Sequence, residues 1–157
     1  MSTVELSDEE AEVHMRIRDI LDAKPSHEVI TIAPEAGVSE LIALLAEHNV
    51  GALIVSSDGS SVDGIVSERD VVRHLHSDGT VINNVVSAIM TAVVETADMD
   101  TPLDELMKTM TERRIRHVPV VHDGKLAGII SIGDVVKHKI GQLEFERDQL
   151  DSYVHQT

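Results

Sequence analysis

The sequence contains no cysteine and only two aromatic residues, Phe145 and Tyr153, among 157 residues. Without cysteine, the chain forms no disulfide bond, no thiolate metal site and no cysteine nucleophile. Both rings lie near the C-terminus, where they cannot form a platform on which nucleic acid bases stack. The core must therefore be built from Val, Ile, Leu, Ala and Met.

Positive charge is also scarce, with 13 Lys and Arg against 28 Asp and Glu and a formal net charge of −15. Such a chain repels nucleic acid phosphates and anionic lipid. No apolar run approaches the ~20 residues of a membrane-spanning helix. The first ten residues are acidic where a secretory signal would be basic and then apolar. We therefore expect a cytoplasmic protein with no nucleic acid or membrane partner.

An internal repeat dominates the rest of the sequence. The segment GIVSERDVV (64–72) recurs as GIISIGDVV (128–136), and EHNVGALIVSSDG (47–59) recurs as ERRIRHVPVVHDG (112–124). Such self-similarity indicates that one supersecondary unit is built twice. Residues 77–84 hold turn-forming residues and should connect the copies.

Each copy predicts the element order βαββα. A short β-rich stretch, at 29–34 or 93–98, precedes an amphipathic helix, and two strands joined at an Asp-Gly turn and a closing helix follow. We expect the second amphipathic helix to have Thr101 as N-cap and Pro102 at its first position. The apolar helix faces are Val38, Leu41, Ile42 and Leu45 in the first copy, and Leu103, Leu106, Met107 and Met110 in the second.

One such unit leaves an apolar face of its sheet exposed, so two copies packed face to face are needed to bury it. The expected fold is therefore an α/β protein of two βαββα repeats.

The motifs resemble those of a tandem pair of CBS domains, called a Bateman module, and are similar to small stand-alone bacterial CBS-pair proteins. The resemblance is carried by the twin G-h-h-S-x-x-D segments, where h is an apolar residue, by RHVPVV in the second copy, and by the pairing of SERD with SIGD. It implies pseudo-twofold symmetry between the repeats. The expected divisions are an acidic N-terminal segment, two CBS repeats and a C-terminal helical extension, at residues 1–15, 16–77, 85–140 and 141–157.

The repeated motif also has a purely structural interpretation. At a strand-to-helix junction, Ser67 with Asp70 and Ser131 with Asp134 form capping boxes that bind free backbone amides of the helix. A carboxylate at the mouth of a cleft can additionally accept hydrogen bonds from both hydroxyls of a ribose. The helix N-terminus favours phosphate and the Asp repels it, so the ribose should lie at the Asp with the phosphate farther away.

By the resemblance, two clefts each draw on both repeats and bind an adenosyl ligand, such as AMP, ADP, ATP, NAD or S-adenosylmethionine. The implied residues of the first cleft are Ile30, Gly51, Ala52, Arg116, Ile129, Ser131 and Asp134. Those of the second cleft are Ser67, Arg69, Asp70, Thr91, Val93, His117 and Val118.

The copies differ in their cations, because the second has Arg116 and His117 where the first has Gly-Ala, and Arg69 of SERD corresponds to glycine in SIGD. The resemblance implies that Arg116 and His117 bind phosphate. The alternative is that both are ordinary surface residues of a strand that faces acidic helices. We expect the two clefts to differ in affinity or in ligand.

Neither a metal site nor catalysis is expected. His74 and His76 are two residues apart on a predicted helix and point in nearly opposite directions, and the other histidines are scattered. No nucleophile elbow, Walker loop or zinc-protease motif is present. We therefore predict no catalytic residue, metal ligand or catalytic cofactor, although Mg²⁺ can accompany an ATP ligand.

The last predicted helix extends past the repeat and carries an apolar stripe that Arg147 interrupts. Isolated helices of this length are marginal in water, so the stripe should pack against a partner, and CBS resemblance implies a homodimer. The stripe contains Val136, Ile140, Leu143, Leu150 and Val154.

The leading hypothesis is a regulatory module that binds adenine nucleotides and passes its state to an unknown regulated protein. The alternative is a constitutive dimerisation scaffold with vestigial nucleotide clefts. A catalytic role in nucleotide turnover lacks a nucleophile and a base. Base and ribose contacts are shared by all the adenosyl candidates, so these residues do not select among them.

Overall fold

The computed structural model describes residues 15–24, 28–92 and 95–155. Val93, predicted for the second cleft, and residues 1–14 of the acidic segment lie outside the described residues. The elements in chain order are α2 (Ile17–Asp22), β1 (Thr31–Ile32), α3 (Val38–His48), β2 (Ala52–Val55), β3 (Gly64–Ser67), α4 (Glu68–Ser77), η1 (Val81–Asn83), η2 (Val86–Ala88), α5 (Leu103–Arg113), β4 (His117–His122), β5 (Lys125–Ser131) and α6 (Ile132–Val154).

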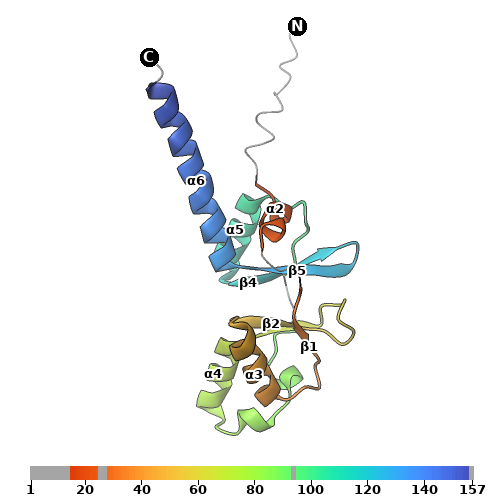
Figure 1. Ribbon diagram of the computed structural model, residues 1–157. Coiled ribbons are helices and arrows are strands. Elements are labelled where there is room, and N and C mark those ends of the chain that lie inside the picture. Colours follow the sequence, from red (N-terminus) through yellow and green to blue (C-terminus); the bar gives the residue numbers. More distant parts are fainter. Residues whose placement is uncertain (1–14, 25–27, 93–94, 156–157) are drawn as a thin grey trace.

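The molecule consists of two halves whose sheets face each other, with the helices on the outer sides (Figure 1). The first sheet has the order β1-β2-β3, in which β1 is parallel and β3 antiparallel to β2. In the second sheet β4 pairs with β5 in antiparallel orientation. A backbone hydrogen bond from Leu126 N to Ser60 O (2.8 Å) links the halves. This is the α/β architecture of two repeats predicted from the sequence.

The second repeat departs from the predicted pattern at its start. Of the β-rich stretch predicted at 93–98, the structure describes residues 95–98, in which Ala97 forms a single parallel bridge with Val120. The α5 helix begins at Leu103, one residue later than predicted, and Pro102 is its N-cap. The reason is local, because Thr101 Oγ1 accepts a hydrogen bond from Asp98 N (3.1 Å) within the preceding turn and does not cap the helix.

Each half buries an aliphatic core under its sheet. In the first half, Ile42 of the predicted apolar face is 40% exposed, so the buried face of α3 is narrower than predicted. Its buried residues are Val38, Leu41 and Leu45. The corresponding residues of α5 are Leu103, Leu106 and Met110, with Met107 partly buried beside them.

The segment at the start of each repeat packs into the half that contains the sheet of the other repeat. The α2 helix belongs to the second core, with Ile17, Ile20 and Leu21 buried against α5, β4, β5 and α6. Val81 of η1, in the connection, and Val86 and Ile89, at the start of the second repeat, belong to the first core. The two sequence repeats therefore interlock in space, and neither half is formed by one repeat alone.

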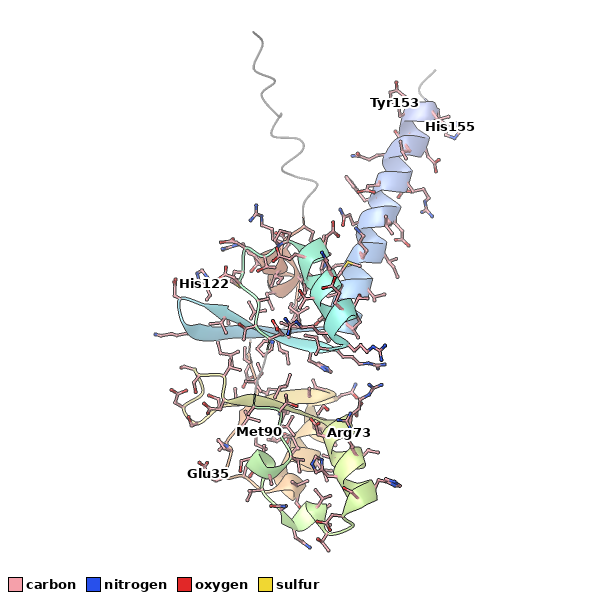
Figure 2. The ribbon with its side chains drawn as sticks, turned by 180° about the vertical axis from the view of Figure 1, so that it is seen from behind. Glu35, Arg73, Met90, His122, Tyr153 and His155 are labelled. Carbon is pink, nitrogen blue, oxygen red and sulfur yellow. The ribbon has the colours of Figure 1, made fainter. Side chains whose placement is uncertain are left out.

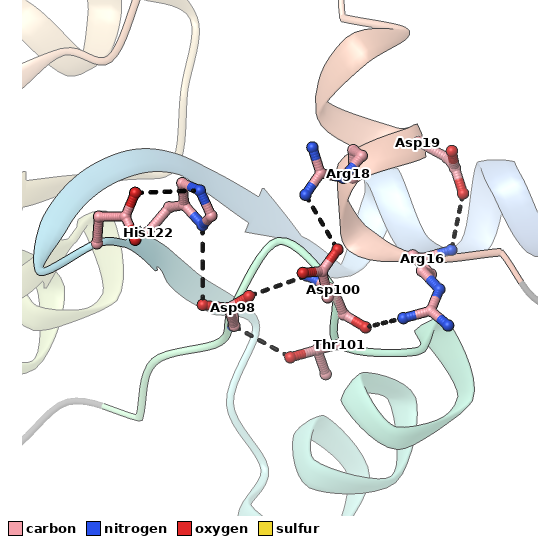
Figure 3. A network of polar contacts seen from close by, with 8 residues as sticks. Arg16, Arg18, Asp19, Asp98, Asp100, Thr101 and His122 are labelled. Carbon is pink, nitrogen blue, oxygen red and sulfur yellow. Dashed lines mark hydrogen bonds and ion pairs between the residues drawn. The ribbon is translucent and has the colours of Figure 1, made fainter.

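Two arginines at the start of α2 hold this helix in the second half, as Figure 3 shows. Arg16 donates from Nη1 to the carbonyl oxygen of Asp100 (2.9 Å), and Arg18 donates from Nη2 to Asp100 Oδ1 (3.0 Å). The pKa of Arg18 is raised, first by the hydrogen bond and then by the charge of Asp100. These contacts hold α2 against the turn that leads into α5.

The glycine that begins each copy of the repeated motif lies close to the segment that enters from the other repeat. A Cβ at Gly64 would lie 2.7 Å from the carbonyl oxygen of Thr91, and a Cβ at Gly128 would lie 2.7 Å from Cδ2 of Leu21. Both distances are shorter than real Cβ contacts, so a side chain at Gly64 would force the backbone at Thr91 to shift, and one at Gly128 would force the side chain of Leu21 to shift.

Candidate functional site

Both predicted capping boxes are confirmed. Asp70 Oδ2 accepts a hydrogen bond from Ser67 N (2.8 Å), and Ser67 Oγ accepts one from Asp70 N (3.3 Å). The second box has the same bonds, from Ser131 N to Asp134 Oδ2 (2.9 Å) and from Asp134 N to Ser131 Oγ (3.1 Å). The motif thus starts α4 and α6 in equivalent ways and points both helix N-termini toward the space between the halves.

A cavity of about 550 Å³, here called the large cavity, lies at these helix N-termini. This volume falls within the ~300–1,000 Å³ typical of small-molecule sites. Nine of the predicted site residues line it together: Gly51, Ala52, Ser67, Arg69, Asp70, Thr91, Arg116, His117 and Ser131. The structure therefore places Gly51, Arg116 and Ser131, assigned to the first cleft in the sequence analysis, beside residues assigned to the second.

A second cavity of about 160 Å³, here called the small cavity, lies between β2 and β5 and the segment before β1. It falls below the size range of small-molecule sites. Three predicted first-cleft residues line it: Ile30, Ala52 and Ile129. Val118, predicted for the second cleft, is 1% exposed within the second core and is not among the residues that line either cavity.

Lys24 distinguishes the two carboxylates of the capping boxes. Its Nζ donates to the carbonyl oxygen of Ile129 (2.7 Å) and lies 3.0 Å from Asp134 Oδ2. Both side chains of this ion pair are 28% exposed. Burial raises the pKa of Asp134, but hydrogen bonds from Ser131 N and Lys24 and the charge of Lys24 outweigh it, so the pKa is lowered. Asp134 is thus held as a paired anion.

Asp70 is differently placed. Its Oδ2 accepts bonds from Ser67 N and Ser67 Oγ (3.0 Å). Within the described part of the chain, no Lys or Arg pairs with Asp70, and its Oδ1 makes no hydrogen bond. This carboxylate therefore keeps a free acceptor at the large cavity.

The large cavity also gathers the cations that the sequence analysis assigned separately, and two that it missed. Arg69 and Arg73 come from α4, and Arg114 and Arg116 come from the segment between α5 and β4. Figure 2 shows Arg73 on α4. Spacing alone gave a weak signal, because Arg73 is one helical turn after Arg69, but the proximity of Arg114 depends on how the halves meet.

His117 also lines this cavity. A Cβ built at Gly51 would lie 3.5 Å from Oε1 of Glu68 and 3.6 Å from Cε1 of His117, so these two side chains flank Gly51. Burial lowers the pKa of His117, although the charges of Asp134 and Glu68 raise it. The neutral imidazole is therefore favoured, and the permanent positive charge of the cavity comes from arginine.

The described residues contain no group of three or more His, Asp or Glu arranged to hold a metal ion. Across the same residues, no helix has both the length and the apolar character of a membrane span.

Comparison with known proteins agrees with the fold and the motifs. The model of the CBS domain matches two segments of the chain, residues 17–77 and 86–141. This chain belongs to the CBS-domain family. The matches cover both sequence repeats, and no catalytic family is indicated.

Among curated relatives, the chain is 34% identical over 122 residues to a mitochondrial CBS domain-containing protein of Arabidopsis thaliana, CBSX3, covering 74% of this chain and 59% of the relative. The chain spans about half the length of the first curated relatives that it matches, from 46% to 59%. The shared part is thus the CBS pair.

Solved structures give the same result. A CBS-domain containing protein from Agrobacterium tumefaciens is 41% identical, with a TM-score of 0.75, over 80% of this chain and 99% of that one. The CBS domain pair of protein MJ0100, solved in complex with 5′-methylthioadenosine and S-adenosyl-L-methionine, is 27% identical, with a TM-score of 0.71, over 82% of this chain and 98% of that one.

Proposed function

We propose that this CBS pair is a regulatory module that binds one adenosyl nucleotide per chain in the large cavity. The observation that carries the proposal is the meeting, in one cavity of adequate size, of a carboxylate with a free oxygen and several arginines. The binding of two adenosyl compounds by the MJ0100 pair supports the ligand class.

In the proposed pose, Asp70 Oδ1 accepts hydrogen bonds from the ribose hydroxyls, since Oδ2 is used by the capping box. The adenine lies toward Ile65 and Thr91, which line the same cavity, and the phosphate lies toward Arg116. This pose separates the phosphate from the carboxylate, as their like charges require.

The small cavity is not expected to bind the same ligand. It is too small for a nucleotide, and Lys24 already occupies the carboxylate that would bind the ribose. A ligand there would have to displace a cation from two hydrogen-bond acceptors, Asp134 Oδ2 and the Ile129 carbonyl oxygen. This explains how two equivalent capping boxes yield one binding site.

Binding at the large cavity can act as a signal because its lining residues come from both halves. A ligand that contacts both halves stabilises whichever relative arrangement fits it best, and only such differential affinity shifts a conformational equilibrium. The regulated partner protein and the cytoplasmic location stay predictions.

Calorimetric titration with AMP, ATP, NAD and S-adenosylmethionine tests the proposal. We expect at least one of the four to bind with a stoichiometry of one per chain. If none of the four compounds binds, the result would contradict the proposal and favour the alternative, a constitutive scaffold with vestigial clefts.

We also propose that α6 mediates homodimerisation. This helix has 23 residues and extends away from the second half (Figure 1). Its predicted stripe is exposed, from 47% at Val136 to 66% at Leu150. Sedimentation velocity should give a dimer for the parent chain and a monomer for Leu143→Glu, and an unchanged sedimentation coefficient would refute the role of α6.

A further inference from the structure

We propose that the large cavity selects nucleotides that carry two or three phosphates over AMP, adenosine and S-adenosylmethionine. This inference rests on the proposed function and deepens it, because it names the class of ligand. Its basis is the set of four arginines that line the cavity, here called the arginine cluster: Arg69, Arg73, Arg114 and Arg116.

The arginine cluster is unusual for this chain, whose formal net charge is −15. Arginines elsewhere are paired, such as Arg18 with Asp100 (3.0 Å) and Arg113 with Glu95 (2.6 Å). Within the described residues, the side chains of the cluster form no ion pair or hydrogen bond. Glu68 and Asp70 are the carboxylates among the lining residues, so the cavity has an excess of positive charge. An anionic ligand supplies the missing partners.

The arrangement of the cluster fits an extended anion. Arg69 and Arg73 are four residues apart and follow one face of α4 away from Asp70, whereas Arg114 and Arg116 approach from the opposite half. A single phosphate next to a ribose at Asp70 reaches only part of this set. A chain of two or three phosphates extends along the helix face and can contact cations of both halves.

Arg114 adds an independent argument from the backbone. It is the C-cap of α5 and has a left-handed conformation, with φ of 55°. The equivalent residue of the first repeat is Asn49, with φ of 50°. Asparagine tolerates this region because its side chain can bond the local backbone, whereas arginine gains no such compensation. An unfavourable residue that lines a cavity points to a functional role.

S-adenosylmethionine carries a positive sulfonium centre in place of the phosphates. The arginine cluster repels it, so this chain should differ from the MJ0100 pair in its preferred ligand.

The test is calorimetric titration of the full chain with adenosine, AMP, ADP, ATP and S-adenosylmethionine at one ionic strength, with and without Mg²⁺. We expect the affinity to rise by roughly tenfold for each added phosphate from AMP to ATP, as one good charge-assisted contact provides. S-adenosylmethionine should bind more weakly than AMP. Equal affinities for adenosine, AMP and ATP, or tighter binding of S-adenosylmethionine, would overturn this inference and leave the proposed function intact. Failure of all five, and of NAD, to bind would overturn the proposed function itself.

Two variants locate the effect. Arg114→Asn introduces the residue that the first repeat has at this position, so the left-handed backbone is preserved, and Arg73→Ala removes a cation from exposed helix surface. Each variant should lower the affinity for ATP by roughly tenfold and change the affinity for adenosine by no more than about twofold. The matched control, Lys125→Ala, removes a charge at the hairpin of the second half and should leave both affinities unchanged. Losses for ATP that equal those for adenosine, or that appear equally in the control, would overturn the role of the cluster.

Discussion

The two halves of this molecule share a capping box and differ in what surrounds its carboxylate. In the second half, Asp134 is paired with Lys24 (3.0 Å) beside a cavity of about 160 Å³. In the first, Asp70 keeps Oδ1 free beside a cavity of about 550 Å³. The residues of the repeated motif therefore build both helix starts, and residues outside that motif decide which carboxylate is open to a ligand.

The largest effect in this comparison is expected from the two carboxylates. Asp70→Asn keeps an acceptor for Ser67 N but loses the charged acceptor for the ribose, so ligand affinity should fall by about 10- to 100-fold. Asp134→Asn is the matched variant and should change affinity by less than about twofold, since its partner is Lys24. Calorimetry measures both, and equal losses in the two variants would mean that the cavities are equivalent.

The next largest effect concerns the repeated glycine. In Gly64→Ala the new Cβ meets the backbone oxygen of Thr91, whereas in Gly128→Ala it meets the side chain of Leu21. Backbone cannot move as cheaply as a leucine rotamer, so we expect Gly64→Ala to lower the free energy of unfolding by about 1–3 kcal/mol and Gly128→Ala by less. Denaturant unfolding provides the comparison. The opposite ranking would show that Leu21 is packed against Gly128 more rigidly than the backbone of Thr91 is packed against Gly64.

A smaller effect is expected when the cation of the small cavity is removed. In Lys24→Met the pKa of Asp134 should rise, because its main cationic partner is lost. The lowered pKa contributes stability above the unfolded-state pKa, and this stability is lost as the pH falls through the folded-state value. The variant should therefore be less stable than the parent at neutral pH, and its stability should fall less as the pH is lowered. Thermal melts from pH 7 to 3 would reveal both effects. An unchanged pH profile would show that Lys24 does not hold Asp134.

The smallest effect concerns the two hairpins. The first has an eight-residue connection, residues 56–63, in which Asp58 Oδ1 accepts bonds from Ser61 N (2.7 Å) and Ser60 N (2.8 Å). These bonds lower the pKa of Asp58 to about 2. The second hairpin turns at Asp123 and Gly124, both with positive φ. Acidification from pH 4 to pH 2 should therefore loosen the first hairpin, which amide exchange by NMR would detect. An Asp58 that titrates at 3.8, its ordinary value, would contradict this.

Much of the fold could be predicted from the sequence because its signals are local. Apolar spacing predicted α3 and α5, and the twin serine–aspartate motif predicted both capping boxes. The repeat predicted two small sheets packed face to face, because one unit alone leaves an apolar face of its sheet exposed. The boundaries were less exact, as at Pro102, where a hydrogen bond between Asp98 and Thr101 sets the start of α5.

The packing of α2 and the composition of the two cavities depend on contacts between segments that are distant in the sequence, and local sequence patterns do not predict such contacts. Nothing in the helical pattern of α2 indicates that its apolar face packs against the second half. Lys24 is an ordinary lysine in the sequence, and its contact with Asp134 spans 110 positions of the chain. The grouping of Arg69 with Arg114 likewise follows from the face-to-face packing and is invisible in either repeat.

The most direct test of the asymmetry is a crystal structure of the chain with ATP. We predict one nucleotide per chain, with its ribose hydroxyls at Asp70, its phosphates among the arginines of the large cavity, and the Lys24–Asp134 pair intact. Density for a nucleotide in the small cavity, with its ribose on Asp134 and Lys24 displaced, would contradict the account.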